Sequence, residues 1–119
     1  MKNNNTESTR YYSSAHEQSV AKELGGTANS SSGSGHFQKG DVIQYAASLL
    51  VECKCTMTPK SSVSIRKEWI EKNKEEVFST RLSNSAVCIN FEPGGDNYYL
   101  INSKLMKFLV EKLIEEGDA

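Results

Sequence analysis

Two short β-strands joined by a tight turn are predicted by residues 41–55, DVIQYAASLLVECKC. In its second half, one set of alternate residues is Leu49, Val51, Cys53 and Cys55, and the other set is Leu50, Glu52 and Lys54. A period of two is typical of a strand whose two faces meet different surroundings. The two strands meet near residues 46–48, so we expect an antiparallel hairpin.

The rest of the chain predicts helices and a second hairpin around this stretch. Before the first hairpin we expect a helix at 14–24 that ends at Gly25-Gly26, followed by a Ser/Gly-rich loop at 27–35. After the hairpin we expect a helix over 65–78, capped near Ser62 or Ser64, and then strands at 86–91 and 98–101 on either side of a turn. The last element is a helix capped by Ser103, with Gly117 past its end. This order predicts an α/β protein with a mixed central β-sheet flanked by helices.

Length and composition limit the classes to which the chain can belong. Its 119 residues suit one domain, which we place at residues 11–119 after a flexible arm at 1–10. The longest apolar run, residues 46–51, is far shorter than the roughly 20 residues of a membrane span, and the first ten residues lack the apolar segment of a secretion signal. We therefore expect a cytoplasmic protein without a membrane. Three cysteines at no disulfide spacing predict free thiols.

The two later helices each carry an apolar stripe. In the first, the stripe is Ile65, Trp69, Asn73 and Val77 with Ile70 and Phe78, and the solvated face is Arg66, Lys67, Glu68, Glu71, Lys72, Glu75 and Glu76. In the last helix a wide stripe from Leu105 to Ile114 is expected to be mostly core, with a dimer interface as the alternative.

The chemistry is concentrated in the first hairpin. Glu52 and Lys54 lie on a strand that is otherwise apolar, where ionised groups are costly unless they are paired or bind a cation. Asp41 opens the preceding strand, and an antiparallel hairpin would bring both carboxylates to one end of the sheet. Paired carboxylates suit Mg²⁺, which takes one or two protein carboxylates and keeps several waters.

The motif Lys39-Gly40-Asp41-Val42 followed by Leu50-Val51-Glu52-Cys53-Lys54 resembles the Asp…Glu-x-Lys signature of the PD-(D/E)XK nuclease superfamily. With Glu17 in the first helix and the loop at 33–35, the order also resembles that of the archaeal-type Holliday junction resolvases and their phage relatives, over about residues 10–105. Gly40 stands where the superfamily's name has a proline.

This resemblance implies a restriction-endonuclease-like fold and assigns roles to individual residues. Asp41 and Glu52 would bind Mg²⁺, or Mn²⁺ in its place, together with the backbone carbonyl of Cys53. Lys54 would serve the attacking water, Glu17 would complete the acidic cluster, and Ser34 would lie near the scissile phosphate. The protein would be a homodimer that cuts four-way DNA junctions and leaves 5′-phosphate and 3′-hydroxyl ends, with no small-molecule cofactor.

Other interpretations fit parts of the pattern. A Glu-x-Lys pair also occurs at solvated sheet edges, and Glu17 follows Ser14 at the spacing of a capping box. Lys60, Arg66 and Lys67 would form either a phosphate-contacting edge or a solvated helix start. The alternatives in function are a repair or restriction-type endonuclease that acts on linear duplex, and a non-catalytic nucleic-acid-binding subunit. The net charge of −1 counts weakly against any protein that coats DNA by bulk positive charge.

Overall fold

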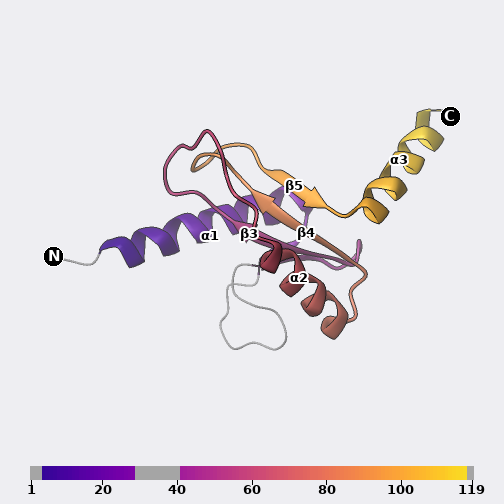
Figure 1. The fold of residues 1–119 in the computed structure, drawn as a ribbon, viewed down its shortest axis with the longest axis horizontal. Coiled ribbons are helices and arrows are strands. Elements are labelled where there is room, and N and C mark those ends of the chain that lie inside the picture. Colours follow the sequence, from indigo (N-terminus) through magenta and orange to yellow (C-terminus); the bar gives the residue numbers. More distant parts are fainter. Residues whose placement is uncertain (1–3, 29–40, 118–119) are drawn as a thin grey trace.

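A computed structural model describes residues 4–28 and 41–117, which form helices and strands around one sheet (Figure 1). In chain order the elements are α1 (Asn4–Leu24), β1 (Thr27–Ala28), β2 (Asp41–Gln44), β3 (Leu49–Lys54), α2 (Lys67–Thr80), β4 (Asn84–Ile89), β5 (Tyr98–Ile101) and α3 (Ser103–Gly117). The predicted α/β class and mixed sheet are therefore confirmed. None of the helices in these residues is both long and apolar enough to span a bilayer.

The five strands lie in the order β1-β2-β3-β4-β5. The pairs β2–β3 and β4–β5 are antiparallel, as both predicted hairpins require, whereas β3 and β4 are parallel. A parallel pair needs a crossover connection, and α2 lies within it. In the first hairpin Asp41 lies opposite Glu52, and Val42 lies opposite Val51. Because directly opposed residues share a face of the sheet, the two acids lie on one face and the two valines on the other.

The main hydrophobic core lies on the valine face of the sheet. Val20 and Ala21 of α1 pack there against Val42 and Val51, with Ala86 and Cys88 of β4 completing the cluster. On the acid face Leu50 and Val87 are also buried, and α2 packs against β3 and β4. Helices α1 and α2 therefore cover opposite faces, and the acids lie under α2.

The N-terminal elements differ from the prediction in two places. Helix α1 begins at Asn4 rather than Ser14, so it takes in most of the segment expected to be an arm; no glycine or proline precedes Gly25 to interrupt a helix. Thr27 and Ala28, expected in a loop, form β1 against Ile43 and Val42. This pairing is a tertiary contact, and no periodic pattern in the two-residue segment predicts it. Gly26 permits it, because a Cβ there would lie 2.7 Å from the carbonyl oxygen of Ile43.

Both later helices begin at residues other than the predicted caps. Helix α2 begins at Lys67, and its N-cap, Arg66, has an extended backbone and no side-chain capping hydrogen bond. The connector before it is held against the second hairpin, since the Lys60 N–H donates to the Phe91 carbonyl at 2.8 Å. In α3 the cap is Asn102 rather than Ser103, because the Asn102 Oδ1 accepts from the Leu105 N–H at 2.8 Å.

The buried face of α2 keeps Trp69, Asn73 and Val77 of the predicted stripe but includes Glu76 and leaves out Phe78. Phe78 is 87% exposed, whereas Glu76, expected in solvent, is only 7% exposed. Asn73 is fully buried, and its Nδ2 donates to the carbonyl of Ala86 at 2.9 Å. The helix is therefore turned so that polar side chains meet the sheet, because the surface beneath it includes acids and backbone carbonyls.

Helix α1 is joined to β5 by hydrogen bonds to Glu23. Its Oε1 accepts from the hydroxyl of Tyr99 at 2.5 Å and from Nδ2 of Asn97 at 3.0 Å. These bonds hold the pKa of Glu23 below its ordinary value of 4.5, because they favour the ionised carboxylate. A carboxyl whose pKa is lowered by folding stabilises the folded state above its ordinary pKa, and this stabilisation is lost as the pH falls through the lowered value.

The variant Tyr99→Phe is therefore expected to lower the free energy of unfolding at pH 7 by about 1 kcal/mol, the usual worth of one solvent-accessible hydrogen bond. The difference from wild type should shrink as the pH falls below the ordinary pKa of 4.5. Urea unfolding at pH 7 and pH 3 measures it, with Tyr98→Phe as the control. A difference that is equal at both pH values would assign the effect to packing of the ring instead.

Candidate metal centre

The first hairpin brings two acidic side chains together, as the sequence predicts. Asp41 is the first residue of β2, and its register partner on β3 is Glu52. Asp41 is 1% exposed and Glu52 is 8% exposed. Two carboxylates are thus held side by side on the α2 face of the sheet, inside the protein.

A third carboxylate, from α2, completes the cluster. One oxygen each of Asp41, Glu52 and Glu76 lies within 4.8 Å of the others. Glu76 reaches the sheet because it follows Trp69 and Asn73 at spacings of seven and three residues, which place all three on one side of a helix. The hydrogen bond from Asn73 to Ala86 fixes this side of α2 against β4.

Three carboxylates at this spacing repel one another, so the cluster favours a bound cation. Two ionised carboxylates 4.8 Å apart repel by about 3.5 kcal/mol at an effective dielectric constant of about 20. A cation between them replaces this repulsion with attraction. Mg²⁺, Mn²⁺ and Ca²⁺ are hard cations, which prefer carboxylate oxygens to softer ligands such as thiolates. The donor set therefore fits a hard divalent cation.

Lys54 lies at the edge of the acidic cluster. Its Nζ is 3.0 Å from Oε2 of Glu52 and 4.9 Å from the centre of the Trp69 ring. The cation–π contact and the ion pair together orient the ammonium group. The side chain remains 34% exposed, so the ammonium can also reach a molecule arriving from solvent. The site thus combines three buried acids with one oriented, accessible ammonium group.

Glu17 is buried in α1, at 6% exposure, but does not belong to the group formed by Asp41, Glu52 and Glu76. Burial raises the pKa of the Cys53 thiol, and the negative charges of Glu17, Asp41 and Glu52 raise it further. All three acids therefore lie within electrostatic reach of Cys53. Metal binding by Glu17 and by the Cys53 carbonyl stays a prediction, and Ser34 lies outside the described residues.

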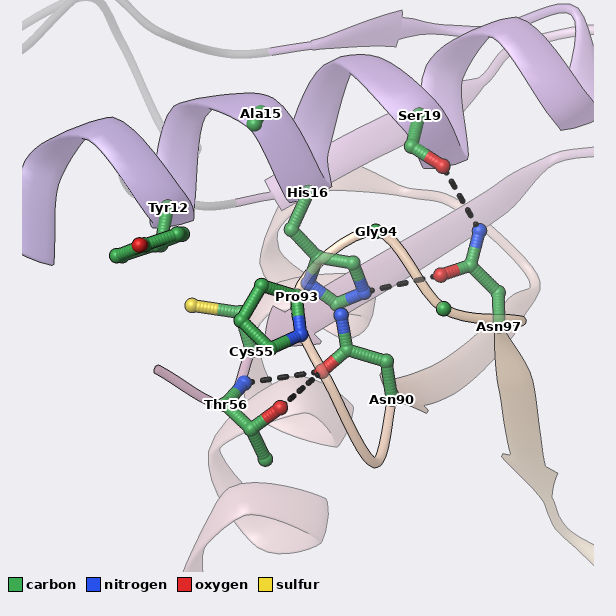
Figure 2. Close-up of a pocket in the computed structure, with 11 residues that line it drawn as sticks. Tyr12, Ala15, His16, Ser19, Cys55, Thr56, Asn90, Pro93, Gly94 and Asn97 are labelled. Atoms are coloured by element: carbon green, nitrogen blue, oxygen red, sulfur yellow. Dashed lines mark hydrogen bonds between the residues drawn. The ribbon is translucent and has the colours of Figure 1, made fainter. Parts of the chain in front are cut away.

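A small pocket lies between α1 and the loops that follow β3 and β4, and Figure 2 shows the residues that line it. His16 Nε2 lies 3.2 Å from Asn97 Oδ1 and 3.6 Å from the sulfur of Cys88. On the far side of the pocket, Asn90 Oδ1 accepts from the N–H and hydroxyl of Thr56, both at 2.9 Å. The volume, about 50 Å³, holds water but is too small for a nucleotide base.

A cysteine in contact with a histidine can be a catalytic thiol, but here burial keeps both side chains uncharged. Burial raises the pKa of Cys88 to about 12, so the thiol is neutral at pH 7. Burial also lowers the pKa of His16 below its ordinary value of 6.5, which keeps the imidazole neutral. Cys88 belongs to the main core cluster, and His16 of α1 lies in contact with it. All three cysteines are free, as predicted.

Glu76 is the member of the site that the sequence analysis misses. The pattern assigns it to the solvated face because glutamate is usually exposed and because Phe78 and Val77 define the apolar stripe. The signal that the sequence offers is Asn73, since a polar residue in line with Trp69 indicates a face that packs against polar groups.

Searches of family models, of curated proteins and of solved structures found no match to this chain.

Proposed function

We propose that this protein is a divalent-cation-dependent endonuclease that hydrolyses phosphodiester bonds in branched DNA. The observation that carries the proposal is the buried group of Asp41, Glu52 and Glu76, with ligand oxygens within 4.8 Å of one another and Lys54 alongside. Buried acids are costly in a domain of this size, and binding of a cation offers a reason to keep three together.

The arrangement of elements supports a restriction-endonuclease-like fold. A hairpin carries Asp41 and the Glu52-x-Lys54 motif, and a helical crossover returns the chain to a parallel strand, β4. The motif residues share the face of the sheet that α2 covers. The resemblance to junction resolvases is therefore consistent with where these residues lie, and the superfamily assignment is part of the proposal.

Each residue has a role in the proposed reaction. Asp41, Glu52 and Glu76 would hold Mg²⁺ or Mn²⁺, which supplies a Lewis acid for the scissile phosphate when bound. The ammonium of Lys54 would donate hydrogen bonds that position the attacking water and would stabilise negative charge that develops on the phosphate. The cation–π contact with the Trp69 ring helps to keep Lys54 in place. The products would carry 5′-phosphate and 3′-hydroxyl ends.

The surface beside the site offers basic groups for a DNA backbone. Lys60, Arg66 and Lys67 are exposed on the connector and first turn of α2. Their partners are weak, since Arg66–Glu68 and Lys67–Glu71 are exposed ion pairs at 3.8 Å. Phosphates could replace these carboxylates at little cost. The choice of a four-way junction over linear duplex rests on the resemblance, which also implies a homodimer.

A cleavage assay tests the proposal. A labelled synthetic four-way junction and a linear duplex of the same sequence are incubated with wild type or Glu52→Ala, in Mg²⁺ or in EDTA. Symmetric nicks in the junction alone, lost with EDTA and in the variant, are the expected result. The control is Glu75→Ala, which removes an exposed glutamate from α2 and should leave cleavage unchanged.

The other outcomes separate the alternatives. Equal cutting of both substrates would replace junction resolution with general endonuclease activity. Tight junction binding without cutting in Mg²⁺ or Mn²⁺ would identify a non-catalytic binding subunit. Cutting that survives EDTA and Glu52→Ala would refute the assignment of the acidic cluster.

A further inference from the structure

Helix α3 exposes the apolar stripe that the sequence predicts to be mostly core. It extends away from the sheet after β5 and has no buried residue (Figure 1). The exposed apolar residues of the helix are Met106, Phe108, Leu109, Val110, Leu113 and Ile114. The expectation of core burial is therefore wrong, and nothing in the described residues shows what covers this stripe. A different exposed surface, beside the acidic cluster, does point to a ligand.

This second surface is the aromatic pair of Phe91 and Tyr98, at the β5 edge of the sheet. Tyr98 opens β5 and is 52% exposed, and Phe91 lies two residues past the end of β4 and is 36% exposed. Their rings meet edge to face, with centres 5.6 Å apart. An edge-to-face contact leaves ring faces open to a flat partner. Helix α2 packs against β3 and β4 but makes no comparable contact with β5, so it does not cover the pair.

The aromatic pair lies in line with Lys54. The register partner of Lys54 on β4 is Ile89, and the register partner of Ile89 on β5 is Tyr98. Because directly opposed residues share a face of a sheet, Tyr98 belongs to the same face as Glu52 and Lys54. Two strand spacings separate Tyr98 from Lys54, which is roughly 10 Å, or about three base steps of stacked DNA. A DNA strand with a phosphate at the acidic cluster therefore passes within reach of the ring.

Charged side chains around the aromatic pair favour a nucleic acid strand as the partner. The Lys60 N–H donates to the Phe91 carbonyl at 2.8 Å, so the connector that carries Lys60 runs beside the pair. Lys54 and Lys60 thus supply cations for phosphates next to the rings. The turn after Phe91 holds two exposed acids, Glu92 and Asp96, which repel phosphates. Phosphates therefore suit the lysines, and the uncharged face of a base suits the rings.

We propose that Phe91 and Tyr98 stack an unpaired base of the DNA, within about three nucleotides of the bond that is cut. An aromatic ring can stack on any base, but a base inside a paired duplex is out of its reach. The substrate class is then DNA with unpaired nucleotides beside the scissile phosphate, as at an open branch point. The proposal rests on the proposed function, because it takes the acidic cluster to be the cleavage site.

DNA binding in EDTA tests the stacking without requiring cleavage. Fluorescence anisotropy gives the affinities for a labelled oligothymidine and for a fully paired duplex. Tyr98→Leu, which keeps an apolar contact for Phe91, should weaken oligothymidine binding by about 5-fold to 150-fold, the usual effect of losing one stacked base. Its affinity for duplex should be unchanged, and Tyr98→Phe should bind both as wild type does. The control Tyr45→Leu changes an exposed tyrosine in the turn at the other end of β3 and should have no effect.

Three results would overturn the proposal. They are a wild-type protein that does not bind oligothymidine, a Tyr98→Leu protein that binds it normally, and equal losses on oligothymidine and duplex. The last result would show that Tyr98 only holds the hairpin in shape. Circular dichroism on each variant shows whether the fold is kept.

An abasic scan of a four-way junction tests the same contact in the wild-type protein. Each nucleotide next to the branch point is replaced in turn by a sugar without a base, and binding is again measured in EDTA. One replacement should weaken wild-type binding by about 5-fold to 150-fold and should have no further effect on Tyr98→Leu. A scan without any such position, or one with equal effects in both proteins, would refute the stacking. Because neither measurement requires cleavage, the stacking and nuclease proposals can fail separately.

Discussion

Replacing Glu76 with glutamine is expected to remove most of the stabilisation that Mg²⁺ gives the folded protein. Glutamine keeps the size and shape of the side chain but supplies no charge to a cation held with Asp41 and Glu52. Loss of a partner of a metal ligand costs about 10–100-fold in affinity, so loss of a ligand should cost at least about 100-fold. Without metal, the variant should melt at the same temperature as wild type or at a higher one, because one of three mutually repelling charges is gone.

Thermal unfolding with and without Mg²⁺ measures this effect. At about 100 times its dissociation constant the cation stabilises wild type by about 2.7 kcal/mol, and a roughly 100-fold weaker site retains only about 0.4 kcal/mol at the same concentration. For a domain of this size the difference is a shift of roughly 10 °C against about 2 °C. The control is Glu75→Gln, an exposed neighbour on the same helix. A full Mg²⁺ response in Glu76→Gln would exclude Glu76 from the site.

Replacing Lys54 with methionine is expected to slow DNA cleavage by about 100-fold to 1,000-fold without loss of cation binding. Removing one group that stabilises charge in a transition state has an effect of this size. Methionine is an unbranched apolar side chain that cannot donate to a water or a phosphate. Because Lys54 is the ion-pair partner of Glu52, its removal leaves the acids more negative, and Mg²⁺ should bind at least as tightly.

Single-turnover cleavage at saturating DNA and Mg²⁺ separates these two effects. Lys72→Met is the control, since Lys72 is an exposed lysine of α2 that has no place in the proposed site. The role assigned to Lys54 requires a slower chemical step with unchanged junction affinity. If the variant instead cleaves at the wild-type rate once DNA saturates, Lys54 would be a phosphate-binding residue and not part of the chemistry.

The first hairpin can be predicted from the sequence because its information is local. Alternation along residues 49–54 indicates which side chains share a face, and the short turn fixes the strands as antiparallel. Together these two local features are enough to bring Asp41 and Glu52 to one end of the sheet; that they share a face follows from the register of the pair. The second hairpin is similar, since glycines in the turn mark its position. Both predicted pairings are confirmed.

Glu76 and α3 cannot be predicted in the same way because their environments come from outside their own segments. The usual interpretation of an amphipathic helix assumes an apolar surface beneath it, and that assumption buries Phe78 and exposes Glu76. The surface under α2 contains acids, so Glu76 is buried and Phe78 is exposed. In α3 the stripe is identified correctly, but an apolar stripe does not specify whether its partner lies in the same chain or in another.

The three acids of the cluster come from three consecutive elements, β2, β3 and α2, within residues 41–76. Helix α1 begins and helix α3 ends toward opposite ends of the molecule's longest dimension, 60 Å, and away from this segment (Figure 1). One contiguous stretch thus encodes the whole acidic cluster. In evolutionary terms, gene fusions beyond either helix can add partners or DNA-binding modules while leaving the carboxylates untouched.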